Sequence, residues 1–233
     1  MTPGTVQNKD AFLNKIAGQL GRDRKEQVTL PAWQHQPQWK VYKNKTVEGL
    51  AHAFKENSEA KSVRVVETDK ANLAASIQEV IHQFGGGPIV TTNDARFSEL
   101  DLEAILNADD THVWNAAIGQ ENIEIAKKAN IGLFFSEVSL AESGTVVQFN
   151  DKDIARSVSL LPLVYVAIVP KSSIVPRMTQ ATHAIHQRVQ AKKDIPTCIN
   201  FISGPSNSAD IEMDIVIGVH GPVEAVHVIV TDQ

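Results

Sequence analysis

Short polar side chains gather in residues 203–208, which read Ser203-Gly204-Pro205-Ser206-Asn207-Ser208. Gly204 permits backbone angles that other residues avoid, and Pro205 stiffens the exit from the turn. Serine and asparagine at such a turn cap backbone N–H groups or leave those N–H groups directed at an anion. The sequence therefore predicts a binding site for a small anion here, built from Ser203, Gly204, Ser206, Asn207, Ser208 and, in the next turn, Gly221.

Two acids follow this turn, Asp210 and Glu212. On a strand they would share one face, and paired carboxylates bind a metal or divide acid and base roles. The same two acids can also cap a turn and form salt bridges with Arg156 or Arg177. Both interpretations stay open, and we favour the structural one. Both acids remain candidate ligand-binding residues.

A third turn reads Ala141-Glu142-Ser143-Gly144 and lies between two apolar segments. Open α/β sheets bind ligands outside the carboxyl ends of their strands, so this position makes Glu142 the first catalytic candidate. The alternative is a solvated glutamate or one that anchors nearby backbone N–H groups, and the two interpretations are balanced. His220, held between Gly218 and Gly221, is the second candidate, as an acid or a base.

Arg156 lies in an otherwise apolar segment, residues 153–162, and needs a carboxylate partner. That partner is Asp210, Glu212 or the carboxylate of a substrate, which makes Arg156 a candidate ligand-binding residue. An intrachain salt bridge is the interpretation we favour. His183 and His186 have the spacing of metal ligands but no acidic third ligand on the same face, so we expect no metal site there.

Strands and helices alternate along most of the chain. Apolar runs predict strands at residues 62–66, 89–91, 132–138, 146–149, 163–169, 199–202 and 226–230. Helical spacing predicts helices at residues 46–57, 70–84, 122–129, 153–160 and 175–190. This order predicts an α/β fold with a mainly parallel sheet flanked by helices. The carboxyl ends of parallel strands share one edge, so we expect Glu142, residues 203–212 and His220 to converge in one polar pocket.

The first 45 residues differ from the remainder. They contain an amphipathic helix at residues 10–20 and then an extended segment rich in Gln, Pro and Lys. We expect residues 1–45 to form a helical N-terminal arm and residues 46–233 to form one α/β domain.

Composition limits the class of protein. A net charge of −5 argues against nucleic acid as a partner. No apolar run reaches the roughly 18 residues of a membrane span, and residues 1–10 lack the features of a signal peptide, so we expect a cytoplasmic protein. Cys198 is the single cysteine, and an iron–sulfur cluster normally needs about four thiolates.

The two turns after residue 203 also resemble a known family. Ser203-Gly204-Pro205-Ser206-Asn207-Ser208-Ala209-Asp210-Ile211-Glu212, followed by Gly218-Val219-His220-Gly221-Pro222, resembles the signature of the lactate utilization protein C family, whose members carry a LUD domain. The resemblance extends from about residue 46 to the C-terminus. It implies a fold similar to that of the sugar-isomerase and CoA-transferase superfamily.

The resemblance implies a bacterial protein needed to oxidise L-lactate to pyruvate alongside partner subunits that carry iron–sulfur clusters. With one cysteine and no dinucleotide fingerprint, this chain is expected to hold no cofactor of its own and to bind, besides those partners, a small carboxylate or phosphate. The alternative is a small-molecule isomerase or CoA-transferase-like enzyme that uses Glu142, since Ala141-Glu142-Ser143-Gly144 is similar to a transferase motif.

Overall fold

The computed structural model describes residues 6–25, 27–29, 31–193, 195–209 and 215–233. It forms two compact units, residues 1–36 and residues 37–233. The first unit contains helix α1 (Lys9–Gln19), which matches the predicted helix. Ala17 is the residue that α1 buries, whereas Phe12 is 63% exposed. None of the described helices combines the length and the apolarity that a membrane crossing needs.

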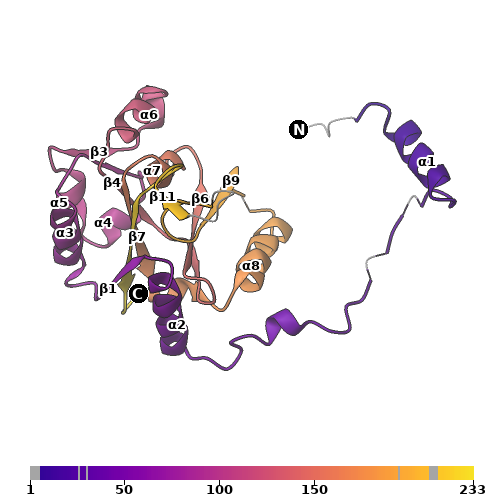
Figure 1. Ribbon diagram of the computed structural model, residues 1–233, viewed down its shortest axis with the longest axis horizontal. Helices are drawn as coiled ribbons and strands as arrows, with labels where there is room; N and C mark the ends of the chain where they lie inside the picture. The colour runs from indigo at the N-terminus through magenta and orange to yellow at the C-terminus, as the bar shows by residue number, and fades with distance from the viewer. Residues whose placement is uncertain (1–5, 26, 30, 194, 210–214) are drawn as a thin grey trace. The chain divides into compact units, whose positions relative to one another are not determined.

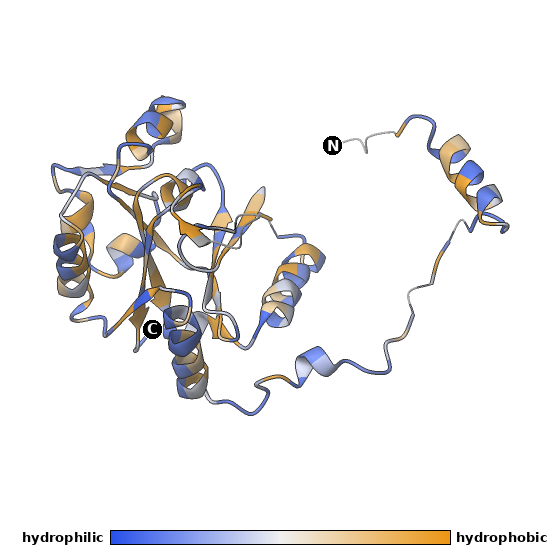
Figure 2. Ribbon diagram, viewed as in Figure 1, coloured by the Kyte–Doolittle hydropathy of each residue, from blue (hydrophilic) through white to orange (hydrophobic). Residues whose placement is uncertain are grey.

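A six-stranded sheet forms the centre of the second unit (Figure 1). All of its neighbouring strands are parallel, so the predicted fold class is confirmed. The strands, in spatial order, are β1 (Arg64–Thr68), β12 (Glu224–Val230), β7 (Val164–Pro170), β4 (Ile131–Phe135), β2 (Ile89–Thr91) and β3 (Thr111–Val113). Figure 2 shows the central strands in hydrophobic colours, as expected for a parallel sheet that is covered on both faces.

Two apolar layers cover the sheet. On one face, Val166, Ile168 and Val228 pack with helices α3 (Leu73–Gln83), α4 (Arg96–Glu99) and α5 (Glu103–Leu106). The opposite face packs with α2 (Val47–Glu59), α6 (Glu121–Ala126) and α7 (Ser157–Leu160). Helix α2 begins as predicted, because the Thr46 side chain accepts a hydrogen bond from the Gly49 N–H at 3.2 Å.

A second, four-stranded sheet stands beside the first. Its order is β8 (Ile174–Val175), β5 (Val138–Leu140), β6 (Thr145–Asn150) and β9 (Cys198–Ile202), and both β5–β6 and β6–β9 are antiparallel. Helix α8 (Met178–Gln190) packs on it through Ala181. The short helix η1 (Pro37–Trp39) contacts α8, with the Trp39 ring 5.2 Å from the His183 ring. Two more short helices, η2 (Ala116–Ile118) and η3 (Lys171–Ser173), lie in loops between these elements.

Two predicted strands differ from the structure. The run 132–138 is divided between β4 and β5, because Ser136 turns the chain out of the parallel sheet. The run 199–202 is the edge strand β9, whose Phe201 is 36% exposed, and not a buried strand. The apolar residues Val216, Ile217 and Val219, close to the predicted anion site, are exposed as well, because their strand β11 (Ile215–Ile217) pairs only with β10 (Asn207–Ala209) among the described strands.

Candidate functional site

Glu142 lies in the hairpin turn between β5 and β6 and forms a two-point ion pair with Arg177. The Arg177 Nε–H donates to Glu142 Oε1 at 3.0 Å, and Arg177 Nη2 lies 3.0 Å from Oε2. Arg177 precedes helix α8, and the Glu142 N–H donates to the Pro176 carbonyl at 3.0 Å. Both carboxylate oxygens are therefore engaged within the chain, which fixes the hairpin turn against the start of α8.

A chain of hydroxyl groups joins the Glu142 turn to the first predicted anion-binding residue. Ser143 Oγ lies 2.7 Å from Thr145 Oγ1, which lies 2.6 Å from Ser203 Oγ. The Lys61 ammonium donates to the Ser143 carbonyl at 2.6 Å. Gly144 approaches the Ser58 backbone so closely that an added Cβ would lie 2.5 Å from the Ser58 nitrogen. The structure thus brings Ser203 next to the Glu142 turn.

Beneath this turn lies a buried line of polar side chains, Ser58, His227 and Tyr165. The Ser58 hydroxyl is 3.1 Å from His227 Nδ1, and the Tyr165 hydroxyl is 3.1 Å from His227 Nε2. Burial lowers the pKa of His227 to about 3, so the imidazole is neutral. Burial also raises the pKa of Tyr165, against a smaller opposing effect of a hydrogen bond with the Gly204 backbone. Each ring nitrogen of His227 therefore has a partner, and the side chain is fully buried within β12.

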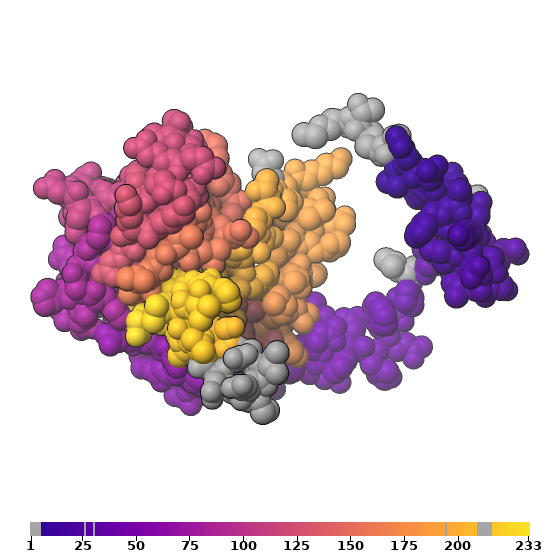
Figure 3. Space-filling view, turned by 45° about the horizontal axis from the view of Figure 1, so that its top comes forward, coloured from indigo at the N-terminus to yellow at the C-terminus, as the bar shows by residue number. Residues whose placement is uncertain are grey.

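Ser206, His220 and Gly221 form a separate group at the amino ends of β7 and β12. The Ser206 N–H donates to the Pro222 carbonyl at 2.8 Å, and the His220 N–H donates to Ser206 Oγ at 3.3 Å. Gly221 lies against the same serine. Residues 216–220 lie at the surface, within the yellow segment of Figure 3. The imidazole of His220 is exposed, and the contacts of its turn are made by its backbone.

The expected location of these turns is wrong in one respect. None of Glu142, Ser203 or Ser206 follows a strand of the six-stranded parallel sheet, because their neighbouring strands belong to the four-stranded sheet or to the β10–β11 hairpin. The argument from shared carboxyl ends therefore does not apply to them. Asn207 and Ser208 lie in β10, and the Asn207 amide donates to the Pro205 carbonyl at 3.0 Å. Asp210 and Glu212 lie outside the described residues.

The carboxyl ends of β2 and β4 instead carry a charged cluster that the sequence did not reveal. Arg96, the first residue of α4, pairs with both carboxylate oxygens of Asp94, through Nε at 3.0 Å and Nη2 at 2.6 Å. Its Nη1 lies 3.4 Å from the carboxylate of Glu137, which follows β4. The guanidinium of Arg96 stacks over the Phe135 ring at 4.8 Å. This is the edge where open α/β sheets bind their ligands.

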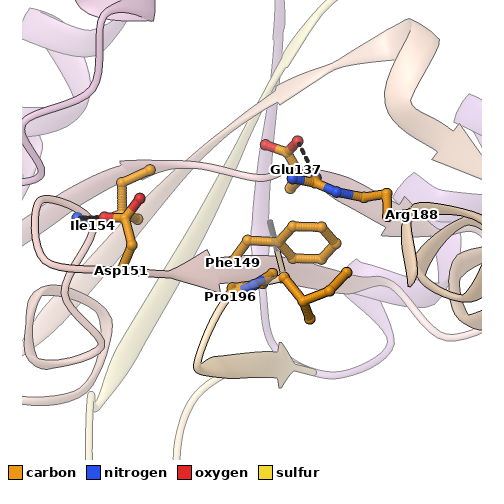
Figure 4. A pocket seen from close by; sticks show the side chains of 7 residues that line it. Glu137, Phe149, Asp151, Ile154, Arg188 and Pro196 are labelled. Atoms are coloured by element: carbon orange, nitrogen blue, oxygen red, sulfur yellow. Dashed lines mark hydrogen bonds and ion pairs between the residues drawn. The ribbon is translucent and has the colours of Figure 1, made fainter. Parts of the chain in front are cut away.

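A cavity of about 230 Å³ adjoins this cluster (Figure 4). Phe149 forms its floor, and Arg188 stacks over that ring at 5.2 Å while its Nη1 lies 3.9 Å from Glu137. The remaining walls come from Asp151, Ile154, Ile195 and Pro196. The lining comes from four separate segments, namely residue 137, residues 149–154, residue 188 and residues 195–196, so no single local motif marks it. The one signal in the sequence was the charged residue Glu137, but it lies within residues 132–138, which the apolar pattern predicted as a single strand.

Arg156 and Cys198, which were also considered from the sequence, lie outside the groups described above. Arg156 precedes α7 and is exposed, and it forms no ion pair with any described residue. Cys198 is half-buried at the start of β9. Across the described part of the chain, no three His, Cys, Asp or Glu side chains are arranged to hold a metal ion.

Comparison with known proteins gives a consistent result. A family model of the LUD domain matches residues 51–231. Proteins named lactate utilization protein C from Bacillus subtilis, Bacillus licheniformis and Macrococcus caseolyticus are 50%, 51% and 44% identical to this chain, each alignment covering 100% of both chains.

A solved structure supports the fold. The crystal structure of a DUF162 family protein from Deinococcus radiodurans superposes with a TM-score of 0.56 at 15% identity, covering 80% of this chain and 99% of that chain. At this identity the likeness concerns the fold alone. The family model and the full-length relatives go further: the chain belongs to the LUD domain family and, within it, to the lactate utilization protein C family.

Proposed function

We propose that this protein is a component of a bacterial L-lactate utilisation system and acts in the cytoplasm in the oxidation of L-lactate to pyruvate. The observation that carries the proposal is its similarity over the whole chain to proteins named lactate utilization protein C, at 50% and 51% identity for the two Bacillus relatives.

The role we assign is not that of the electron carrier. Oxidation of lactate to pyruvate removes two electrons and two protons, so it needs an acceptor. One cysteine cannot supply the roughly four thiolates that an iron–sulfur cluster normally requires. We therefore assign the clusters to partner subunits. This chain binds those partners and a small carboxylate or phosphate.

The alternative, an isomerase or CoA-transferase-like enzyme with Glu142 as acid, base or nucleophile, is less well supported. A carboxylate that attacks a substrate needs a free oxygen. Both oxygens of Glu142 are instead held by Arg177, each at 3.0 Å. The two contacts with the guanidinium also occupy the lone pairs with which the carboxylate would attack a substrate or accept a proton. We therefore assign Glu142 to positioning the hairpin turn.

A deletion strain tests the proposal. Deletion of the gene should abolish growth on L-lactate and leave growth on pyruvate unchanged, because pyruvate enters metabolism after the proposed step. Expression of the wild-type chain from a plasmid should restore growth on lactate. Normal growth of the deletion strain on L-lactate, in a background without a second lactate oxidase, would contradict the proposal.

A further inference from the structure

Strand β9 forms an open edge of the four-stranded sheet (Figure 1). It pairs with β6 on one side and with no described strand on the other. The strand contains no charged residue and no proline, which are the features that usually protect such an edge from pairing. Its residue Phe201 is 36% exposed. Strand β9 is therefore an unprotected edge to which another strand can be added.

The backbone groups that face this open edge follow from the contacts on the other side of β6. The Val147 carbonyl accepts from the Glu137 N–H at 2.8 Å, and the Val147 N–H donates to the Ser136 hydroxyl at 3.1 Å. Both backbone groups of Val147 thus point away from β9. Its direct partner in β9 is Phe201, so this pair is one of the non-hydrogen-bonded pairs of the antiparallel ladder.

Two residues of β9 present their backbone groups to the open edge. Because hydrogen-bonded and non-hydrogen-bonded pairs alternate along a ladder, Phe201 and Ile199 both direct their N–H and C=O groups away from β6. No described residue forms a hydrogen bond with any of these four groups. The edge therefore offers two donors and two acceptors in the spacing that an antiparallel strand requires.

We propose that two copies of this chain associate through β9, paired antiparallel around a two-fold axis at Asn200. Ile199 of each copy then lies opposite Phe201 of the other. Their outward N–H and C=O groups satisfy one another completely, because each residue exchanges two hydrogen bonds with its partner across the interface. The two four-stranded sheets become one sheet that runs through both copies.

The strand's own sequence favours a second copy as the occupant of this edge. A two-fold interface requires a surface that complements itself, and β9 does so about Asn200. Residues two apart share a face of a sheet, so the apolar side chains of Ile199 and Phe201 from the two copies meet on one face and cover each other. Each chain carries a net charge of −5, yet the strands that meet are uncharged, so no like charges oppose each other directly.

Sedimentation velocity of the full chain tests the pairing. The wild type should sediment with twice the mass of one chain. Phe201→Lys places a charge on the edge and should raise the dissociation constant of the dimer at least about tenfold. The Phe201 side chain is exposed, so this variant should keep the circular dichroism spectrum of the wild type. Val28→Lys replaces an apolar residue that is 74% exposed and lies outside β9, and it should dimerise like the wild type.

Cysteine cross-linking tests the register independently of Phe201→Lys. At the two-fold axis the Cα atoms of the two Asn200 residues should lie about 4.5 Å apart, which suits a disulfide. Asn200→Cys in a Cys198→Ser background should therefore give a covalent dimer on mild oxidation. Ile202→Cys in the same background should not, because its two copies lie about 13 Å apart along the strands.

Three results would overturn the proposal. They are a wild type that sediments as a monomer, equal dimerisation of the wild type and Phe201→Lys, and cross-linking by Ile202→Cys in place of Asn200→Cys. A monomeric wild type whose binding to iron–sulfur subunits is weakened by Phe201→Lys would assign the edge to a partner subunit and also overturn the proposal. The growth of the deletion strain on lactate tests the proposed function separately, because it does not depend on the number of copies.

Discussion

The buried imidazole of His227 predicts a dependence of stability on pH. Its pKa is about 3 in the folded protein because burial disfavours the charged form, against about 6.5 in an unfolded chain. As pH falls below 6.5, the unfolded state takes up a proton that the folded state does not bind. The group's full stability is therefore present above pH 6.5 and is lost as pH falls toward 3.

The expected size follows from these two values. The slope is about 1.4 kcal/mol per pH unit between them, so His227 should cost the protein about 2 kcal/mol of unfolding free energy between pH 7.5 and pH 5. Phe54 stacks on the ring at 5.2 Å, and Ser58 and Tyr165 contact its nitrogens, so no described charged group faces the ring to offset this loss.

Urea unfolding of the wild type and of His227→Gln at several pH values measures this effect. Only the difference between the two proteins is used, because carboxylates elsewhere titrate in both. The wild type should lose about 2 kcal/mol more than the variant between pH 7.5 and pH 5. His183→Gln, which removes an exposed histidine, is the matched control and should follow the wild type. Parallel curves for the wild type and His227→Gln would refute the assignment of a buried neutral imidazole.

Three further predictions concern the Glu142 hairpin and the cofactor content. Gly144→Ala should destabilise the protein by at least about 2 kcal/mol more than Gly85→Ala. Both glycines have a positive φ, but of the two only Gly144 would bring the added Cβ against backbone atoms. Equal losses of unfolding free energy in the two variants would contradict this close packing. Glu142→Gln should cost about 1 kcal/mol in urea unfolding and leave growth on lactate intact; a stable variant that cannot grow on lactate would instead make Glu142 catalytic. The chain purified anaerobically without partners should be colourless and free of iron by metal analysis, and stoichiometric iron would disprove this.

Central strands could be predicted from the sequence because burial on both faces leaves a continuous apolar run. Residues 163–169 are the clearest case and form β7 in the middle of the sheet. Residues 132–138 were harder to predict, because the chain passes from one sheet to the other at Ser136 without a break in the apolar pattern. The Ser136 hydroxyl accepts from the Val147 N–H at 3.1 Å, a contact between segments 11 residues apart that no local pattern reveals.

The candidate site was predicted only in part. The polar residues around Ser203 and Glu142 were found because turns concentrate small polar side chains. The hydroxyl contacts of Ser143, Thr145 and Ser203 and the pairing of Glu142 with Arg177 were not predicted, because the partners come from separate segments of the chain. Arg96, Glu137 and Arg188 come from separate segments, so their shared edge became visible only with the strand order.

Reconstitution of lactate oxidation tests the central claim most directly. Purified chain is combined with the iron–sulfur partner subunits, and L-lactate-dependent reduction of a dye is followed together with pyruvate formation. The proposed function predicts no oxidation by this chain alone and full activity only when chain and partners are mixed. Lactate oxidation by the chain alone, or an undiminished rate from the partners without it, would contradict the proposed function.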